Sequence, residues 1–150
     1  MTVHLDTLPS QDQRRPATSP VSLRRLYALR AGYLFVGVGL AVEKWPLFFQ
    51  RDTPWPLMTG VVTCMLTAMS LLALLGIRYP LAMLPVLLFE SAWKLIWFGA
   101  VALPLWRNGQ VDAATQEVVI TCSLVVVVLA VIPWRYVVAQ YVTKRGDRWR

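Results

Sequence analysis

The sequence predicts an all-α integral membrane protein, folded as an antiparallel bundle of four membrane-spanning helices. Of its 150 residues, 57% are hydrophobic and 15% are charged, whereas soluble domains carry about 25% charged residues. The mean hydropathy is +0.52, so too few polar residues are present to coat a soluble surface. The apolar residues also follow one another in long runs. This pattern excludes a membrane β-barrel, whose strands alternate in polarity over about 10 residues.

Four apolar stretches are long enough to cross a membrane, which takes about 20 residues in a helix. The predicted spans are residues 26–42 with a continuation to 49, residues 57–77, residues 81–106 and residues 118–142. The second span contains no charged residue at all. Only Arg78, Tyr79 and Pro80 join the second span to the third, so these two spans are expected to be antiparallel neighbours.

The distribution of basic residues predicts the orientation in the membrane. With four spans, ten Lys and Arg residues fall on the side of both termini, and three fall on the opposite side. Because cytoplasmic segments carry the excess of basic residues, we expect a bacterial cytoplasmic (inner) membrane protein with both termini in the cytoplasm. Residues 1–22 are expected to form a disordered tail, followed by a membrane domain over residues 23–143. Residues 144–150 form a basic tail that is expected to contact anionic lipid headgroups.

Aromatic residues near the span ends support the same orientation. Trp and Tyr side chains concentrate where the apolar core meets water, because their rings are partly polar. Three tryptophans fall at the predicted outer edge and three tyrosines at the inner edge. The expected interface anchors are Trp45, Trp55, Trp106, Tyr27, Tyr79 and Tyr141.

Three charged residues interrupt the third and fourth spans, namely Glu90, Lys94 and Arg135. Each charge at the centre of a span costs about 2.5–3.5 kcal/mol, so these side chains are expected to face protein. Glu90 precedes Lys94 by four residues, which is the favourable direction for a helical ion pair. With a rise of 1.5 Å per residue, Glu90 and Arg135 lie at a similar depth. We therefore expect the three residues to form one buried cluster.

Two interpretations of this cluster remain open at the level of sequence. Ionisable groups inside a membrane often mark proton or anion paths, so the cluster is a candidate relay. Alternatively, Glu90 and Lys94 neutralise each other and hold the third helix against its neighbours. In a further alternative, Arg135 reaches the inner headgroups while residues 136–142 lie along the interface.

Small and hydroxyl-bearing residues in the second span predict a helix-packing seam. Small residues let membrane helices approach closely, and hydroxyl groups can donate hydrogen bonds across the contact. The predicted seam consists of Gly60, Thr63, Cys64, Thr67 and Ala68.

No catalytic residue and no metal or haem site is predicted. The one histidine, His4, lies in the N-terminal tail, which excludes haem held by paired histidines. Cys64 and Cys122 do not form a C-x-x-C motif, and phosphate-binding or nucleophile motifs are lacking. The expected partners are the lipid bilayer and either a second copy or another membrane protein, but no nucleic acid.

Three short segments resemble small, uncharacterised bacterial four-span membrane proteins. They are PWPLM at 54–58, LLGIRYP at 74–80 and FESAWK at 89–94. The glycine-rich first span, the following Lys44 and the L-L-G-x-R turn also resemble, more distantly, the DoxX-like family. The resemblance implies a four-helix membrane fold over about residues 24–142, and some members of that family are linked to quinone or redox complexes. It carries over no catalytic residue.

Two functional classes follow from these observations. The first is a non-enzymatic accessory or structural subunit of a membrane complex. The second is a DoxX-like redox or quinone-linked subunit, or a small proton-coupled carrier that uses Glu90, Lys94 and Arg135. Quinone is the one cofactor that the second class would require.

Overall fold

The computed structural model describes residues 21–49 and 55–144, and all regular structure within them is helical. Four helices are long and apolar enough to cross a membrane: Leu23–Phe49, Leu57–Arg78, Leu84–Arg107 and Ala113–Val131. The prediction of an all-α chain with four helices long and apolar enough to cross a membrane is therefore confirmed. Most of the predicted N-terminal tail and of the C-terminal basic tail lies outside the described residues.

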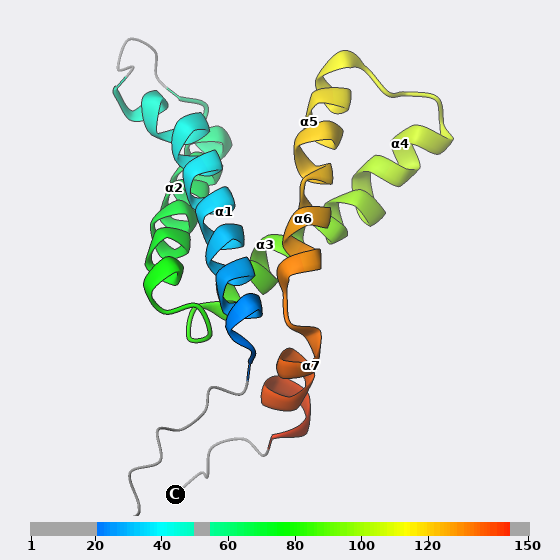
Figure 1. Cartoon of the computed structure of the whole chain (residues 1–150). Helices are drawn as coiled ribbons and strands as arrows, with labels where there is room; N and C mark the ends of the chain where they lie inside the picture. The colour runs from blue at the N-terminus through cyan, green and yellow to red at the C-terminus, as the bar shows by residue number, and fades with distance from the viewer. Residues whose placement is uncertain (1–20, 50–54, 145–150) are drawn as a thin grey trace, which may run out of the picture.

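The first two spans are single helices that lie side by side (Figure 1). They are α1 (Leu23–Phe49) and α2 (Leu57–Arg78). α1 includes the predicted continuation to Phe49, and Pro46 lies within its last turn. At their contact the buried Ser70 hydroxyl donates a hydrogen bond of 2.8 Å to the Gly37 carbonyl. The buried Tyr33 hydroxyl donates one of 2.8 Å to the carbonyl of Pro80, just after α2.

The third span is continuous but changes its helical winding. It consists of α3 (Leu84–Trp97), the π-helical segment η1 (Phe98–Ala102) and α4 (Leu103–Arg107). α3 begins at Leu84, three residues later than predicted, with Pro85 in its first turn, where a missing N–H removes no hydrogen bond. Pro104 follows η1. A proline lacks an N–H group and crowds the preceding turn, which accounts for the wider turn there.

The fourth span ends at Val131, not at residue 142 as predicted. It consists of α5 (Ala113–Ser123) and α6 (Val125–Val131). Ile132 then adopts an extended conformation (ψ 126°), because a residue before proline avoids the helical region. After Pro133 the chain continues as α7 (Trp134–Val137) and the π-helical η2 (Val138–Thr143). Figure 1 shows α7 as a separate segment beyond the end of α6.

The core lies where α1, α2, α3 and α6 meet. Its buried side chains include Leu29 and Tyr33 of α1, Leu87 of α3, Val128 of α6 and Ile132. Away from this crossing, α4 and α5 diverge from the α1–α2 pair (Figure 1). This arrangement covers the middle of α3 and leaves α5 largely exposed.

Candidate functional site

The candidate site is the buried ion pair of α3. The Glu90 carboxylate atom Oε1 lies 2.7 Å from Nζ of Lys94, one helical turn later. Glu90 is 1% exposed and Lys94 is 8% exposed. The other carboxylate oxygen, Oε2, accepts a hydrogen bond of 2.7 Å from the indole N–H of Trp93.

These contacts follow from the sequence spacing. Side chains four residues apart lie on the same face of a helix, so the Lys94 side chain can contact the Glu90 carboxylate in an ordinary helical orientation. Trp93, three residues after Glu90, flanks the pair, and Lys94 Nζ also lies 5.5 Å from the centre of its ring. Both oxygens of Glu90 are thus bonded within α3. The pair carries no net charge, which lowers the free energy needed to bury it.

Arg135 does not join this pair. The prediction of a buried cluster of three charges is therefore wrong for Arg135. Arg135 lies on α7 and is exposed. The predicted depth assumed one straight helix through residue 142. The break at Ile132 and Pro133 ends the span earlier and places Arg135 beside the start of α1, where it lines a hollow with Arg25.

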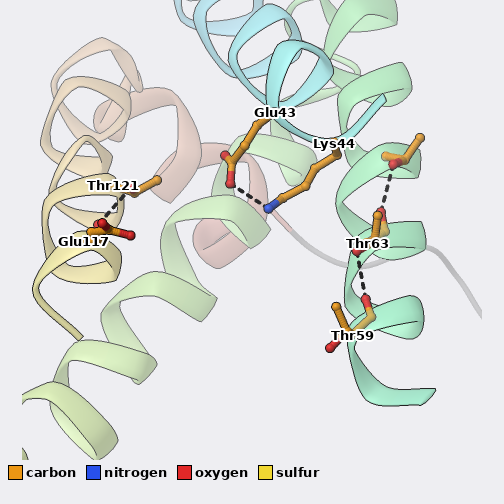
Figure 2. Close-up of polar contacts among 7 residues, drawn as sticks. Glu43, Lys44, Thr59, Thr63, Glu117 and Thr121 are labelled. Atoms are coloured by element: carbon orange, nitrogen blue, oxygen red, sulfur yellow. Dashed lines mark hydrogen bonds and ion pairs between the residues drawn. The ribbon is translucent and has the colours of Figure 1, made fainter. Parts of the chain in front are cut away.

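Three hydroxyl groups on α2 and α3 donate hydrogen bonds to carbonyls of their own helices. Ser91 donates to the Leu87 carbonyl, and Thr63 donates to the Thr59 carbonyl, each at 2.8 Å. Thr67 continues this ladder on α2 by donating to the Thr63 carbonyl at 2.8 Å. Figure 2 shows the bond between Thr63 and Thr59. A hydroxyl that is already donating to a backbone carbonyl has no proton left for another acceptor in that orientation.

A second ion pair, which the sequence analysis did not single out, lies near the end of α1. Lys44 Nζ is 2.6 Å from Oε1 of Glu43. In the view of Figure 2 this pair lies between the threonines of α2 and the Glu117–Thr121 turn of α5. Lys44 is the more buried partner. Two adjacent residues of opposite charge within a long apolar helix were the signal available in the sequence.

The predicted seam on α2 is not the surface that packs against α1. Cys64 and Ala68 are exposed, Thr67 is half-buried and Thr63 is buried. Gly60 approaches only Trp55, which precedes the same helix.

The buried residues of α2 that follow Thr63 are instead Met69, Ser70, Ala73 and Gly76. The small residues among them, spaced by three, were the missed signal for the contact with α1.

Five of the six predicted aromatic anchors lie near the ends of candidate spans, whereas Tyr141 lies on η2, beyond the end of the fourth span at Val131. Three tryptophans lie near the end of α1, before α2 and in α4, whereas three tyrosines lie near the start of α1, after α2 and in η2. They are Trp45, Trp55, Trp106, Tyr27, Tyr79 and Tyr141. Trp55 is half-buried and packs edge-on against Phe48 at 5.1 Å, and the other five are exposed. Their role at a membrane interface stays a prediction.

An apolar groove of about 570 Å³ separates η1 and α4 from α5. Phe98 and Trp106 line one wall, and Val119 lines the other, with Thr115 and Gln116 as the polar groups. α5 buries only Cys122. Within the described part of the chain, no three His, Cys, Asp or Glu residues gather as metal ligands do.

Comparison of the chain with protein-family models, with curated proteins and with solved structures gave no match. The resemblance to the DoxX-like family stays a prediction.

Proposed function

We propose that this chain is a non-enzymatic accessory or structural subunit of a complex in a bacterial cytoplasmic membrane. The observation that carries the proposal is the set of contacts of Glu90. Its two carboxylate oxygens are bonded to Lys94 and Trp93 of the same helix. Such a pair keeps α3 compatible with its buried surroundings, and each carboxylate oxygen has a partner on the same helix.

A proton relay requires groups that exchange partners during each cycle. Breaking a buried ion pair by removing one partner costs about 3–5 kcal/mol, and the hydroxyl of Ser91, the residue after Glu90, already donates to a backbone carbonyl. With Arg135 on α7, no second basic residue joins the pair from the fourth span. The arrangement therefore favours a structural role for Glu90 and Lys94.

The exposed side of α5 supports a role as a subunit. α5 carries Thr115, Gln116 and Thr121 within a candidate span, and all are exposed or half-buried. Polar side chains in membrane helices usually face protein. A transmembrane helix of a partner, apolar along most of its length and with a hydrogen-bonding group near Gln116, fits the groove between α4 and α5.

The orientation with both termini in the cytoplasm belongs to the same proposal. Four spans return the chain to its starting side, and the start of α1 lies near α7 at one end of the molecule (Figure 1). Reporter fusions at the C-terminus and at the α4–α5 turn should report opposite sides of the membrane.

The role of the ion pair is tested with Glu90→Gln, with Glu43→Gln as the matched control at the more exposed pair. We expect Glu90→Gln to lower the yield of folded protein in detergent, because Lys94 loses its counter-charge, and Glu43→Gln to leave it nearly unchanged. In liposomes with an internal pH dye, the wild-type chain should move no more protons than empty vesicles. Proton flux through the wild type that Glu90→Gln abolishes in a folded protein would contradict the proposal.

The subunit role is tested by cross-linking in native membranes. A photoreactive phenylalanine analogue at Val119, in the groove, should form an adduct with a second membrane polypeptide. The same analogue at Val62, an exposed position on α2, should give lipid adducts only. Lipid adducts alone at both positions would show that nothing covers the groove.

The groove also supports a second candidate function, a quinone-linked subunit. Its volume lies in the range of small-molecule sites, about 300–1,000 Å³, and it combines apolar walls with a few polar groups. Thr115 and Gln116 offer donors for a quinone carbonyl, and Trp106 offers a ring beside it. A short-chain ubiquinone should then quench tryptophan fluorescence with saturation, and Trp106→Phe should remove that component. Linear, unsaturable quenching that is the same in Trp106→Phe would exclude this function.

A further inference from the structure

We propose that the hollow between the start of α1 and α7 binds the phosphate group of an anionic phospholipid. The hollow has a volume of about 490 Å³. Its polar wall is formed by Ser22 and Arg25 from the start of α1 and by Arg135 and Tyr136 from α7. This site does not depend on the proposed subunit role.

Two guanidinium groups from different segments border one hollow without a counter-charge. No described residue that lines the hollow is acidic, and within residues 21–49 and 55–144 neither arginine takes part in an ion pair. Both arginines are exposed. Like charges gathered in this way repel each other, and a bound anion removes the repulsion.

The donors in the hollow match a phosphate. Arginine presents a planar fork of N–H groups that bonds two phosphate oxygens at once. Ser22 and Tyr136 add hydroxyl groups at its edge. α1 has 27 residues and starts at Leu23, so the unpaired N–H groups and the positive dipole end of a long helix lie beside the arginines.

The remaining wall indicates a lipid as the source of the phosphate. Val21, Pro133 and Ala139 also line the hollow, and apolar surface of this kind can contact the start of an acyl chain. The hollow lies where the candidate span α1 begins and just after α6, the last part of the fourth candidate span, ends. On the side that we assign to the cytoplasm, anionic lipids attract basic residues by about 1 kcal/mol each.

The break after α6 builds this site. A helix that continued through Ile132 and Pro133 would carry Arg135 onward along the axis of α6. Because the chain turns at these two residues, α7 brings Arg135 to the first turn of α1. The extended conformation of Ile132 thus explains both why Arg135 does not reach the buried ion pair and why it lies beside the start of α1.

The test measures binding of phosphatidylglycerol to the full chain in phosphatidylcholine nanodiscs, by native mass spectrometry and by titration. Arg25→Gln and Arg135→Gln should each weaken retention of phosphatidylglycerol about tenfold, because each removes charge-assisted hydrogen bonds to a phosphate, and tenfold corresponds to about 1.4 kcal/mol. The matched control is Arg24→Gln, the neighbouring exposed arginine that does not line the hollow. It should change retention less than twofold.

Further variants and a competition experiment separate the alternatives. Arg135→Lys keeps the charge but loses the planar fork of N–H groups. Its retention of phosphatidylglycerol should lie between that of the wild type and that of Arg135→Gln, and its melting temperature should be unchanged. Equal losses in Arg24→Gln and Arg135→Gln would show general surface attraction and overturn the site. Displacement of the lipid by millimolar inorganic phosphate would assign the hollow to soluble phosphate and overturn the lipid. Equal retention of phosphatidylcholine would overturn both.

Discussion

The contact between Gly76 of α2 and Tyr33 of α1 gives the sharpest test of the packing. A Cβ atom added at Gly76 would lie 2.5 Å from Cε1 and 2.7 Å from Cγ of the Tyr33 ring. The Tyr33 side chain is fully buried, and its hydroxyl is bonded to the Pro80 carbonyl. The ring therefore cannot move aside without losing that hydrogen bond, and Gly76→Ala must push α1 and α2 apart.

The expected loss of stability follows from two opposing contributions. Inserting a methyl group into a well-packed contact costs about 1–3 kcal/mol, and the rigid, bonded ring of Tyr33 places Gly76→Ala at the upper end. Replacing glycine by alanine within a helix raises the free energy of unfolding by about 1 kcal/mol. We therefore expect Gly76→Ala to lower the free energy of unfolding by about 2 kcal/mol.

The matched control is Gly39→Ala on α1, where an added Cβ has no neighbour within 4 Å. This variant should equal or slightly exceed the wild type. The assay is reversible unfolding of the full chain in mixed micelles with increasing SDS, followed by circular dichroism. In a Tyr33→Leu background, the loss caused by Gly76→Ala should shrink, which a double-mutant cycle measures. Equal stability of Gly76→Ala and Gly39→Ala would refute the helix contact.

Three further predictions concern local contacts. Ser70→Ala removes the buried hydrogen bond to the Gly37 carbonyl and should lower the free energy of unfolding by about 1 kcal/mol in the same SDS titration; no change would mean that the bond forms only weakly. Gly109→Ala places a side chain on a residue with φ of 66° and should cost about 1–2 kcal/mol, measured in the same way against Gly99→Ala, which has no neighbour within 4 Å. Hydrogen bonds to the Asp112 carboxylate, first from the side chain and then from the amide of Thr115, lower its pKa from the ordinary value of 3.8. Stabilisation of the first turn of α5 by this ionised group is therefore present above pH 3.8 and is lost as the pH falls through the lower folded pKa. Hydrogen-exchange protection of the Thr115 amide should fall in that range, and Asp112→Asn should remove the dependence on pH.

The membrane-spanning character was predictable because it depends on local properties. Hydropathy and helix formation involve residues a few positions apart, so the second span was placed to within one residue, at Leu57–Arg78. The pairing of Glu90 with Lys94 is equally local, since a spacing of four fixes it within one helix.

The effect of proline on the spans was not predictable from the sequence. Pro104 and Pro133 were visible in the sequence, yet η1 winds through the third span without ending it, whereas the fourth span ends at Val131. A proline removes one hydrogen bond in either place. Whether the chain then continues or turns depends on the contacts available to the residues that follow.

The faces through which the helices contact one another were decided by the tertiary structure alone. In the sequence, the row of Gly60, Cys64 and Ala68 is as suitable for close packing as the residues that contact α1. Which row meets a neighbour depends on the crossing angle and on single fits, such as the ring of Tyr33 against Gly76. The sequence by itself determined that four apolar helices form and that Glu90 has a partner one turn away. Only the assembled helices decided which faces touch and where Arg135 lies, because contacts between distant residues depend on how all the helices are placed together.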